Sequence, residues 1–280
     1  MCRRYMIFPA SLVLALAACG DDSTGPSGPA ARDDIGEMAR DEVEAALDAL
    51  TVPTTLAPLN VGGPPCVTPS APADTDGDGI PEDATYLFTA PPCRYPGVRG
   101  AALDIVGQLR VQDPSATAGF GYAGSLTALR YSFNPDDADD PDYSVTRNGT
   151  RALDGTTAGL QLATDLQVVR TFPGQPDGQI EELWTVGFTP EGQLQINLPL
   201  PDGTLQISGA MNWTRGEESF PIEVTTAEAL HFDAACEEVQ RFDGGELRLT
   251  SDFGGEPGYI RLRWDRCGGE PAIDFVPAGT

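Results

Sequence analysis

The sequence contains no lysine and a single histidine, His231, among its 280 residues. All 17 basic residues are therefore arginines, which excludes Schiff-base chemistry and phosphate-binding loops that depend on a lysine. The 42 Asp and Glu outnumber these arginines, so the formal charge is −25 at pH 7. A negative charge of this size repels phosphate backbones, so we expect no nucleic-acid partner.

Residues Ile7 to Ala18 form an apolar run near the N-terminus, which is too short to span a bilayer as a permanent helix. The run follows two arginines and ends in Leu16-Ala17-Ala18-Cys19. These four residues resemble the lipobox of bacterial lipoprotein signals, in which the cysteine is acylated and becomes the new N-terminus. The resemblance implies that residues 1–18 are a cleaved signal peptide and that the lipid on Cys19 anchors the protein to a membrane.

The segment after the lipobox, residues 19–32, is polar and rich in Gly, Ser and Pro. Such a composition cannot bury a core, and it predicts a flexible tether. Gly20, next to Cys19, resembles the sorting position of outer-membrane lipoproteins. We therefore expect an outer-membrane lipoprotein whose body faces the periplasm or the cell surface.

Four further cysteines follow Cys19, and an oxidising compartment favours disulfides between them. Three pairings are open from the sequence alone. Pairing by proximity predicts Cys66–Cys93 and Cys236–Cys267, each stabilising by about 3–4 kcal/mol in the chain-entropy model. No CxxC spacing occurs, so a cysteine metal site is not expected.

Residues 74–83 (DTDGDGIPED) hold five carboxylates in ten positions. Carboxylates at alternating positions followed by glycine wrap oxygen ligands around a hard cation, so the loop predicts bound calcium. It resembles a single thrombospondin type 3 repeat, which binds calcium without flanking helices; an EF-hand would need a glutamate where Thr85 stands. A solvated acidic turn is the alternative. The predicted ligands are Asp74, Asp76, Asp78, the Ile80 carbonyl, Glu82 and Asp83.

Residues 33–50 predict one amphipathic helix, because Ile35, Met38, Val43 and Leu47 recur at helical spacing. The opposite face is acidic rather than basic, so we expect the helix to pack on the protein and not on a membrane. A Pro-rich segment, residues 51–83, follows the helix and contains the calcium loop.

From residue 84 to residue 280 the apolar residues alternate with a period of two. The pattern predicts an antiparallel up-and-down meander of about eleven strands, curled into a barrel, half-barrel or sandwich. A change of apolar face after Ala128 predicts a β-bulge.

Local turn and strand signals add detail to the meander. Asn148-Gly149, Pro201-Asp202-Gly203 and Asp243-Gly244-Gly245 predict hairpin turns. Alternation of Leu194, Ile196 and Leu198 predicts a short strand.

Catalytic signatures are scarce. His231 is flanked by apolar residues, which favours a packed or surface histidine over a general base, and no GxSxG elbow occurs. Two carboxylates would suffice for a glycoside hydrolase, although such pairs arise by chance in so acidic a chain. We therefore expect no enzymatic activity. The carboxylates that could form such a pair are Glu181, Glu182, Glu217, Glu218 and Glu223.

These features together predict a lipid-anchored envelope protein that serves as a binding or structural module with a calcium-stabilised loop. The alternative is a carrier of a lipophilic ligand, because one helix and a single-faced sheet resemble the half-barrel carriers of envelope lipoproteins. A lined cavity under the helix would favour the carrier. A core closed by Trp184, Trp213 and Trp264 would argue against it. The sequence identifies neither the ligand nor the oligomeric state.

Overall fold

The computed structural model describes residues 28–50, 67–69, 73–96, 102–115, 117–134, 143–196, 198–236 and 240–279. These residues form one helix and one antiparallel sheet of 12 strands in chain order, which confirms the predicted mainly-β meander. The helix is α1 (Pro29–Ala49). The strands are β1 (Val67–Pro69), β2 (Asp83–Pro96), β3 (Ala102–Gln112), β4 (Tyr122–Asn134), β5 (Tyr143–Thr156), β6 (Gly159–Thr171), β7 (Gly178–Pro190), β8 (Gly203–Arg215), β9 (Glu218–Phe232), β10 (Phe242–Ser251), β11 (Gly258–Trp264) and β12 (Ala272–Pro277).

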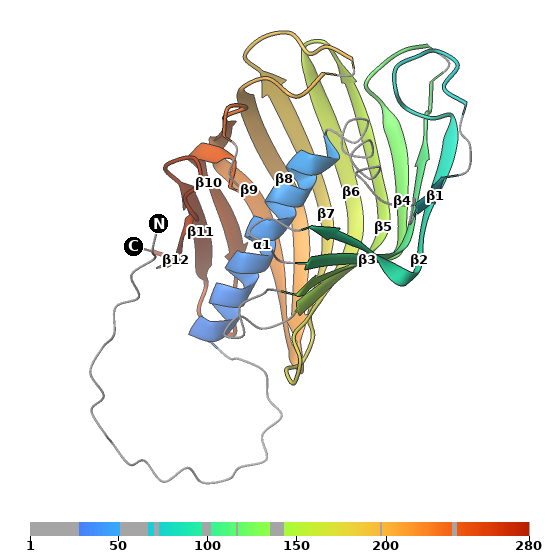
Figure 1. The fold of residues 1–280 in the computed structure, drawn as a ribbon. Helices are drawn as coiled ribbons and strands as arrows, with labels where there is room; N and C mark the ends of the chain where they lie inside the picture. Colours follow the sequence, from blue (N-terminus) through green and yellow to red (C-terminus); the bar gives the residue numbers. More distant parts are fainter. Residues whose placement is uncertain are drawn as a thin grey trace, which may run out of the picture.

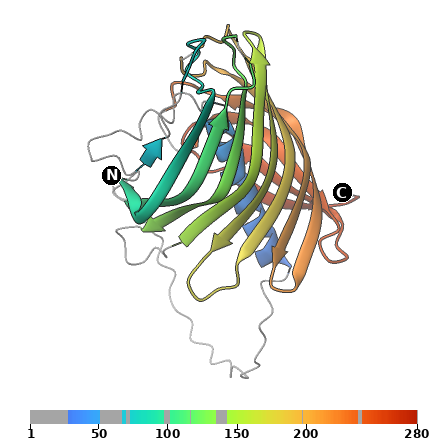
Figure 2. The same ribbon diagram turned by 90° about the vertical axis from the view of Figure 1, so that its right-hand side faces the viewer.

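The sheet is open, because among the described residues its outermost strands β1 and β12 each pair with one neighbour only. It curls around α1, which crosses the concave side (Figures 1 and 2). Strand β7 shows the alternation that produces this arrangement: Ile180, Trp184 and Phe188 are buried, whereas Glu181 and Leu183 are exposed. One face of the sheet therefore forms a core with α1, and the convex face meets solvent.

Glycines within strands allow the sheet to bend. Gly209 in β8 has φ +147°, and a Cβ there would lie 2.1 Å from the Leu183 carbonyl oxygen. Gly149 in β5 has φ +130° and the same close approach to the Asp165 carbonyl oxygen. No side chain fits at either position, so glycine is required there, as at other strand kinks.

A β-bulge in β4 confirms the prediction at Ala128, which has φ +46°. The pairing of β4 with β5 shifts register between Leu126 and Leu129. The Asn148 Oδ1 accepts a 2.7 Å hydrogen bond from the Ala128 amide and so satisfies the donor that the bulge removes from the ladder.

Several local predictions are wrong. Asn148-Gly149 lies in the middle of β5, and Asp243-Gly244-Gly245 lies within β10, so neither is a hairpin turn. At both sites the glycine allows a kink within a strand. The same local sequence is typical of a turn, so the sequence alone does not distinguish the two. The predicted strand at 194–198 is part of the connection from β7 to β8, where the described residues form no strand. Leu194 is nonetheless buried, so the apolar pattern there reports packing of a loop.

Helix α1 begins at Pro29, four residues before the predicted start, since proline is favoured in the first helical turn. Its apolar side chains pack on the sheet as predicted: Ile35, Val43 and Leu47 are fully buried. Burial of each such side chain contributes about 1.5–3 kcal/mol. No helix in the described parts of the chain is both long and apolar enough to cross a membrane.

Candidate functional site

The acidic loop brings together the first three predicted calcium ligands. One carboxylate oxygen from each of Asp74, Asp76 and Asp78 lies within 4.8 Å of the other two. This spacing suits three oxygens around one small cation. Without a cation, three carboxylates so close together repel one another.

Backbone amides hold the loop in this shape. The two oxygens of Asp74 accept hydrogen bonds from the amides of Gly77 (2.8 Å) and Gly79 (3.0 Å). Asp78 is 2% exposed and accepts from the amides of Ile80 (2.8 Å) and Gly119 (3.0 Å). The last bond joins the loop to the β3–β4 connection, so Asp78 also has a structural role.

Asp76 is the least satisfied of the three carboxylates. Its Oδ2 is inaccessible to solvent and has no hydrogen-bond partner among the described atoms. Desolvation and repulsion from Asp78, Asp113 and Asp74 raise the pKa of Asp76, against the lowering effect of its hydrogen bond from the Asp78 amide. A cation in the loop would satisfy this oxygen and relieve the repulsion. Asp113, just after β3, was not predicted as a neighbour, because it lies 35 positions after Asp78 in the chain.

The last two predicted side-chain ligands have other partners in the structure. Asp83 forms a bidentate ion pair with Arg110 (2.8 and 2.6 Å), which lowers the pKa of Asp83. Glu82 accepts a hydrogen bond from the Thr75 hydroxyl. Either would have to give up that contact to reach the three clustered aspartates.

The acidic side of α1 faces arginines of the sheet. Glu42 is 3% exposed and binds Arg147 of β5 through two hydrogen bonds of 2.5 and 3.1 Å. Asp34 binds Arg215 and also accepts from the Trp213 indole N–H at 2.8 Å. Arg170 of β6 also pairs with Glu37 and Asp41 of the helix, and Arg241, directly before β10, pairs with Glu44 and Asp48.

Glu182 of β7 is a buried carboxyl on this concave side, with 3% exposure and no hydrogen-bond partner for its Oε2 among the described atoms. Desolvation and the nearby Glu42 raise the pKa of Glu182 to about 8, although Arg151, Arg147 and Thr164 oppose the shift. Burial beside Glu42 therefore favours the protonated form of Glu182.

Within the part of the chain that the structure describes, large side chains pack on the concave side next to α1. Trp184, Trp213 and Trp264 are each 2% exposed or less and belong to the core under α1. A cleft between the start of α1 and strands β11 and β12 has a volume of about 80 Å³. That volume is well below what a lipophilic ligand of ordinary size requires.

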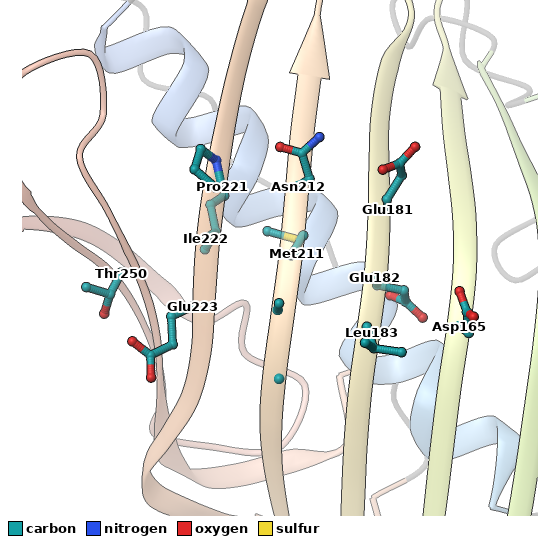
Figure 3. A pocket seen from close by; sticks show the side chains of 12 residues that line it. Asp165, Glu181, Glu182, Leu183, Met211, Asn212, Pro221, Ile222, Glu223 and Thr250 are labelled. Carbon is teal, nitrogen blue, oxygen red and sulfur yellow. The ribbon is translucent and has the colours of Figure 1, made fainter.

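The convex side carries a groove of about 620 Å³ that crosses strands β6 to β10 (Figure 3). Gly209 and Ala210 of β8 leave its centre low, because they have little or no side chain. Two of the carboxylates considered for catalysis, Glu181 and Glu223, line this groove. Glu182 also borders it but is buried, whereas Glu217 and Glu218 lie at the β8–β9 turn. The lining residues are Asp165, Glu181, Glu182, Leu183, Gly209, Ala210, Met211, Asn212, Pro221, Ile222, Glu223 and Thr250.

His231 lies near the surface between two carboxylates. Its Nδ1 is 2.6 Å from Asp243 and its Nε2 is 3.1 Å from Glu191. These hydrogen bonds, that of Asp243 foremost, raise the pKa of His231.

A disulfide joins Cys236 to Cys267 as predicted, with Cα atoms 5.8 Å apart. The other predicted disulfide, Cys66–Cys93, is not tested. Cys66 lies outside the described residues, and of Cys93 only the backbone in β2 is placed. The predicted signal peptide, Cys19 and most of the tether also lie outside the described residues.

Comparison with known proteins finds no matching family model, no matching curated protein and no matching solved structure.

Proposed function

We propose that this chain is a lipid-anchored protein of the bacterial outer membrane that serves as a binding or structural module. The observation that carries this proposal over the carrier alternative is the occupation of the concave side by α1. A carrier needs an apolar hollow for its ligand, but here that position is taken by the helix and by Trp184, Trp213 and Trp264.

The ion pairs of α1 support the same conclusion. Removing the helix from the sheet would expose its apolar face and leave arginines such as Arg147 without their carboxylates. Breaking one buried pair costs about 3–5 kcal/mol. The helix is therefore part of the folded body, and ligand exchange at its position would carry a large free-energy cost.

The lipid anchor is tested by mass spectrometry of the mature protein combined with membrane fractionation. We expect an acylated N-terminal Cys19 in the outer-membrane fraction, and release of the protein into the soluble fraction when Cys19→Ala is introduced. An unacylated mature N-terminus or a cytoplasmic pool of the wild type would refute this part of the proposal.

The second part of the proposal is that the acidic loop binds one calcium ion through Asp74, Asp76 and Asp78, with the Ile80 carbonyl and Glu82 or Asp83 as further ligands. Its support is the three converging oxygens and the unsatisfied Oδ2 of Asp76. Extracellular calcium modules have a Kd of about 10⁻⁴–10⁻³ M.

Isothermal titration of the oxidised protein with calcium tests the site. We expect one ion per chain for the wild type, and loss of binding in Asp76→Asn. Asp177→Asn, which changes an exposed aspartate in the β6–β7 turn, is the matched control and should bind like the wild type. If the wild-type titration releases or absorbs no heat of binding, the calcium site is refuted and the loop is a solvated acidic turn.

A further inference from the structure

The convex groove is built on one cross-strand row of residues. Asp165 of β6 pairs with Leu183 of β7, Leu183 with Ala210 of β8, and Ala210 with Glu223 of β9. Directly paired residues of antiparallel strands point to the same face of a sheet. The row therefore places one carboxylate at each end and two apolar residues between them. Figure 3 shows Asp165, Leu183 and Glu223 of this row.

The charge of the groove has one sign only. Asp165, Glu181 and Glu223 are exposed carboxylates, and none of the twelve lining residues is basic. Leu183 in the centre is 63% exposed, the highest value among the large apolar side chains of the described residues. An apolar surface of this kind between carboxylates is complementary to a ligand with cationic ends and a small apolar middle.

The spacing of the carboxylates restricts the ligand further. Asp165 and Glu223 are three strand intervals apart, which is about 14 Å at about 4.8 Å per interval. An extended polypeptide advances about 3.4 Å per residue, so residues i and i+4 are separated by the same distance, about 14 Å. Side chains at i, i+2 and i+4 of an extended chain also point the same way.

We propose that the groove binds an extended basic segment of a partner polypeptide, with arginine or lysine at positions i and i+4 and a small apolar residue at i+2. The cationic side chains bind Asp165 and Glu223, and the small residue rests on Leu183 above Ala210. Glu181 adds attraction along one side. This inference rests on the proposed function of a binding module and names the chemistry of its partner.

Two synthetic peptides of identical composition test the proposal. Each has a five-residue core of two arginines, one alanine and two threonines; one core has arginine at positions 1 and 5, and the other at positions 2 and 4. Binding to the full-length lipidated protein in detergent is measured by fluorescence anisotropy. We expect the peptide with the wider spacing to bind more tightly, and its affinity to fall as salt is raised.

Substitutions in the groove locate the binding. Asp165→Asn and Glu223→Gln should each weaken the wider-spaced peptide about threefold, the effect of losing one exposed ion pair. Ala210→Leu should also weaken it by filling the centre of the groove. Glu228→Gln, an exposed strand acid outside the groove, is the matched control and should bind like the wild type. Both charge variants are exposed and isosteric, so folding is preserved.

Four outcomes would overturn the proposal. Equal binding of both peptides, or equal losses in Glu223→Gln and Glu228→Gln, would show attraction to the overall negative charge alone. Displacement of the peptide by calcium in the wild type, but not in Asp165→Asn, would make the groove a cation site. No measurable binding would remove the basic segment as a ligand. Each of these results leaves the acylation of Cys19 and the calcium titration untouched, so the proposed function is judged separately.

Discussion

Protonation of Glu182 should make the stability of this protein depend on pH in a way that one substitution removes. The carboxyl is buried beneath α1 and faces Glu42, and the pKa of Glu182 rises to about 8 from an ordinary value of 4.5. Between these values the folded chain holds a proton that the unfolded chain has released. The stabilisation that this proton contributes is therefore fully present below the pKa of the unfolded state. It is lost as the pH rises through the pKa of the folded state.

The magnitude follows from proton linkage. When the folded state holds one proton more than the unfolded state, the free energy of unfolding falls by about 1.4 kcal/mol for each unit by which the pH rises. From pH 5 to pH 8 the loss from this single group is about 3–4 kcal/mol. That is a large share of the 5–15 kcal/mol or so that stabilises a typical protein.

Urea denaturation at three pH values between 5 and 8 measures this effect in wild type and in Glu182→Gln. Glutamine has nearly the same shape and does not ionise, so we expect the variant to lose the downward slope and to become more stable than the wild type near pH 8. Glu181→Gln is the matched control, because this neighbour is exposed on the opposite face of β7. Its stability should follow the wild type at every pH.

Parallel stability curves for wild type and Glu182→Gln would refute the reasoning. They would mean that Glu182 is already ionised in the folded protein, stabilised by Arg147 and Arg151. An equal change in Glu181→Gln would point to the overall charge and not to burial.

The remaining predictions concern the loop, the helix and the histidine. Calcium chelation should lower the melting temperature by a few degrees, because millimolar calcium at the expected Kd stabilises the fold by roughly 0.4–1.4 kcal/mol. Scanning calorimetry measures this shift, and Asp76→Asn should remove it. Arg147→Met should cost about 3–5 kcal/mol in urea denaturation because Glu42 is left buried without a partner. Adding Glu42→Leu should recover much of that loss; no recovery would show that the pair is not coupled. The hydrogen bonds of His231 raise its pKa, so its stabilisation is present below its unfolded pKa and lost as the pH rises through the folded pKa. His231→Gln should thus reduce stability by less than about 1 kcal/mol in mild acid, and by a smaller amount above pH 8, because the side chain is half-exposed; a loss that grows with pH would contradict the role of Asp243.

Several features were determined by the sequence alone because they depend on local patterns. The period-two alternation of β7 and its neighbours predicted an antiparallel sheet with one buried face, and the helical spacing of Ile35, Val43 and Leu47 predicted α1. The alternating carboxylates of the acidic loop likewise placed Asp74, Asp76 and Asp78 around one point. Cys236 and Cys267 were paired by proximity in the chain, and the structure has that disulfide.

Other features were decided only by tertiary structure, because they depend on residues far apart in the chain. The same Asn-Gly signal serves a turn or a kink, and at Gly149 the close approach of the Asp165 carbonyl oxygen made it a kink. The sequence does not indicate which groups the acidic side of α1 meets, because its partners Arg147 of β5, Arg170 of β6 and Arg215 of β8 lie far along the chain. The groove arises in the same way: Asp165 and Glu223 are 58 residues apart, and only the register of four strands places them in one row at the ends of a common hollow.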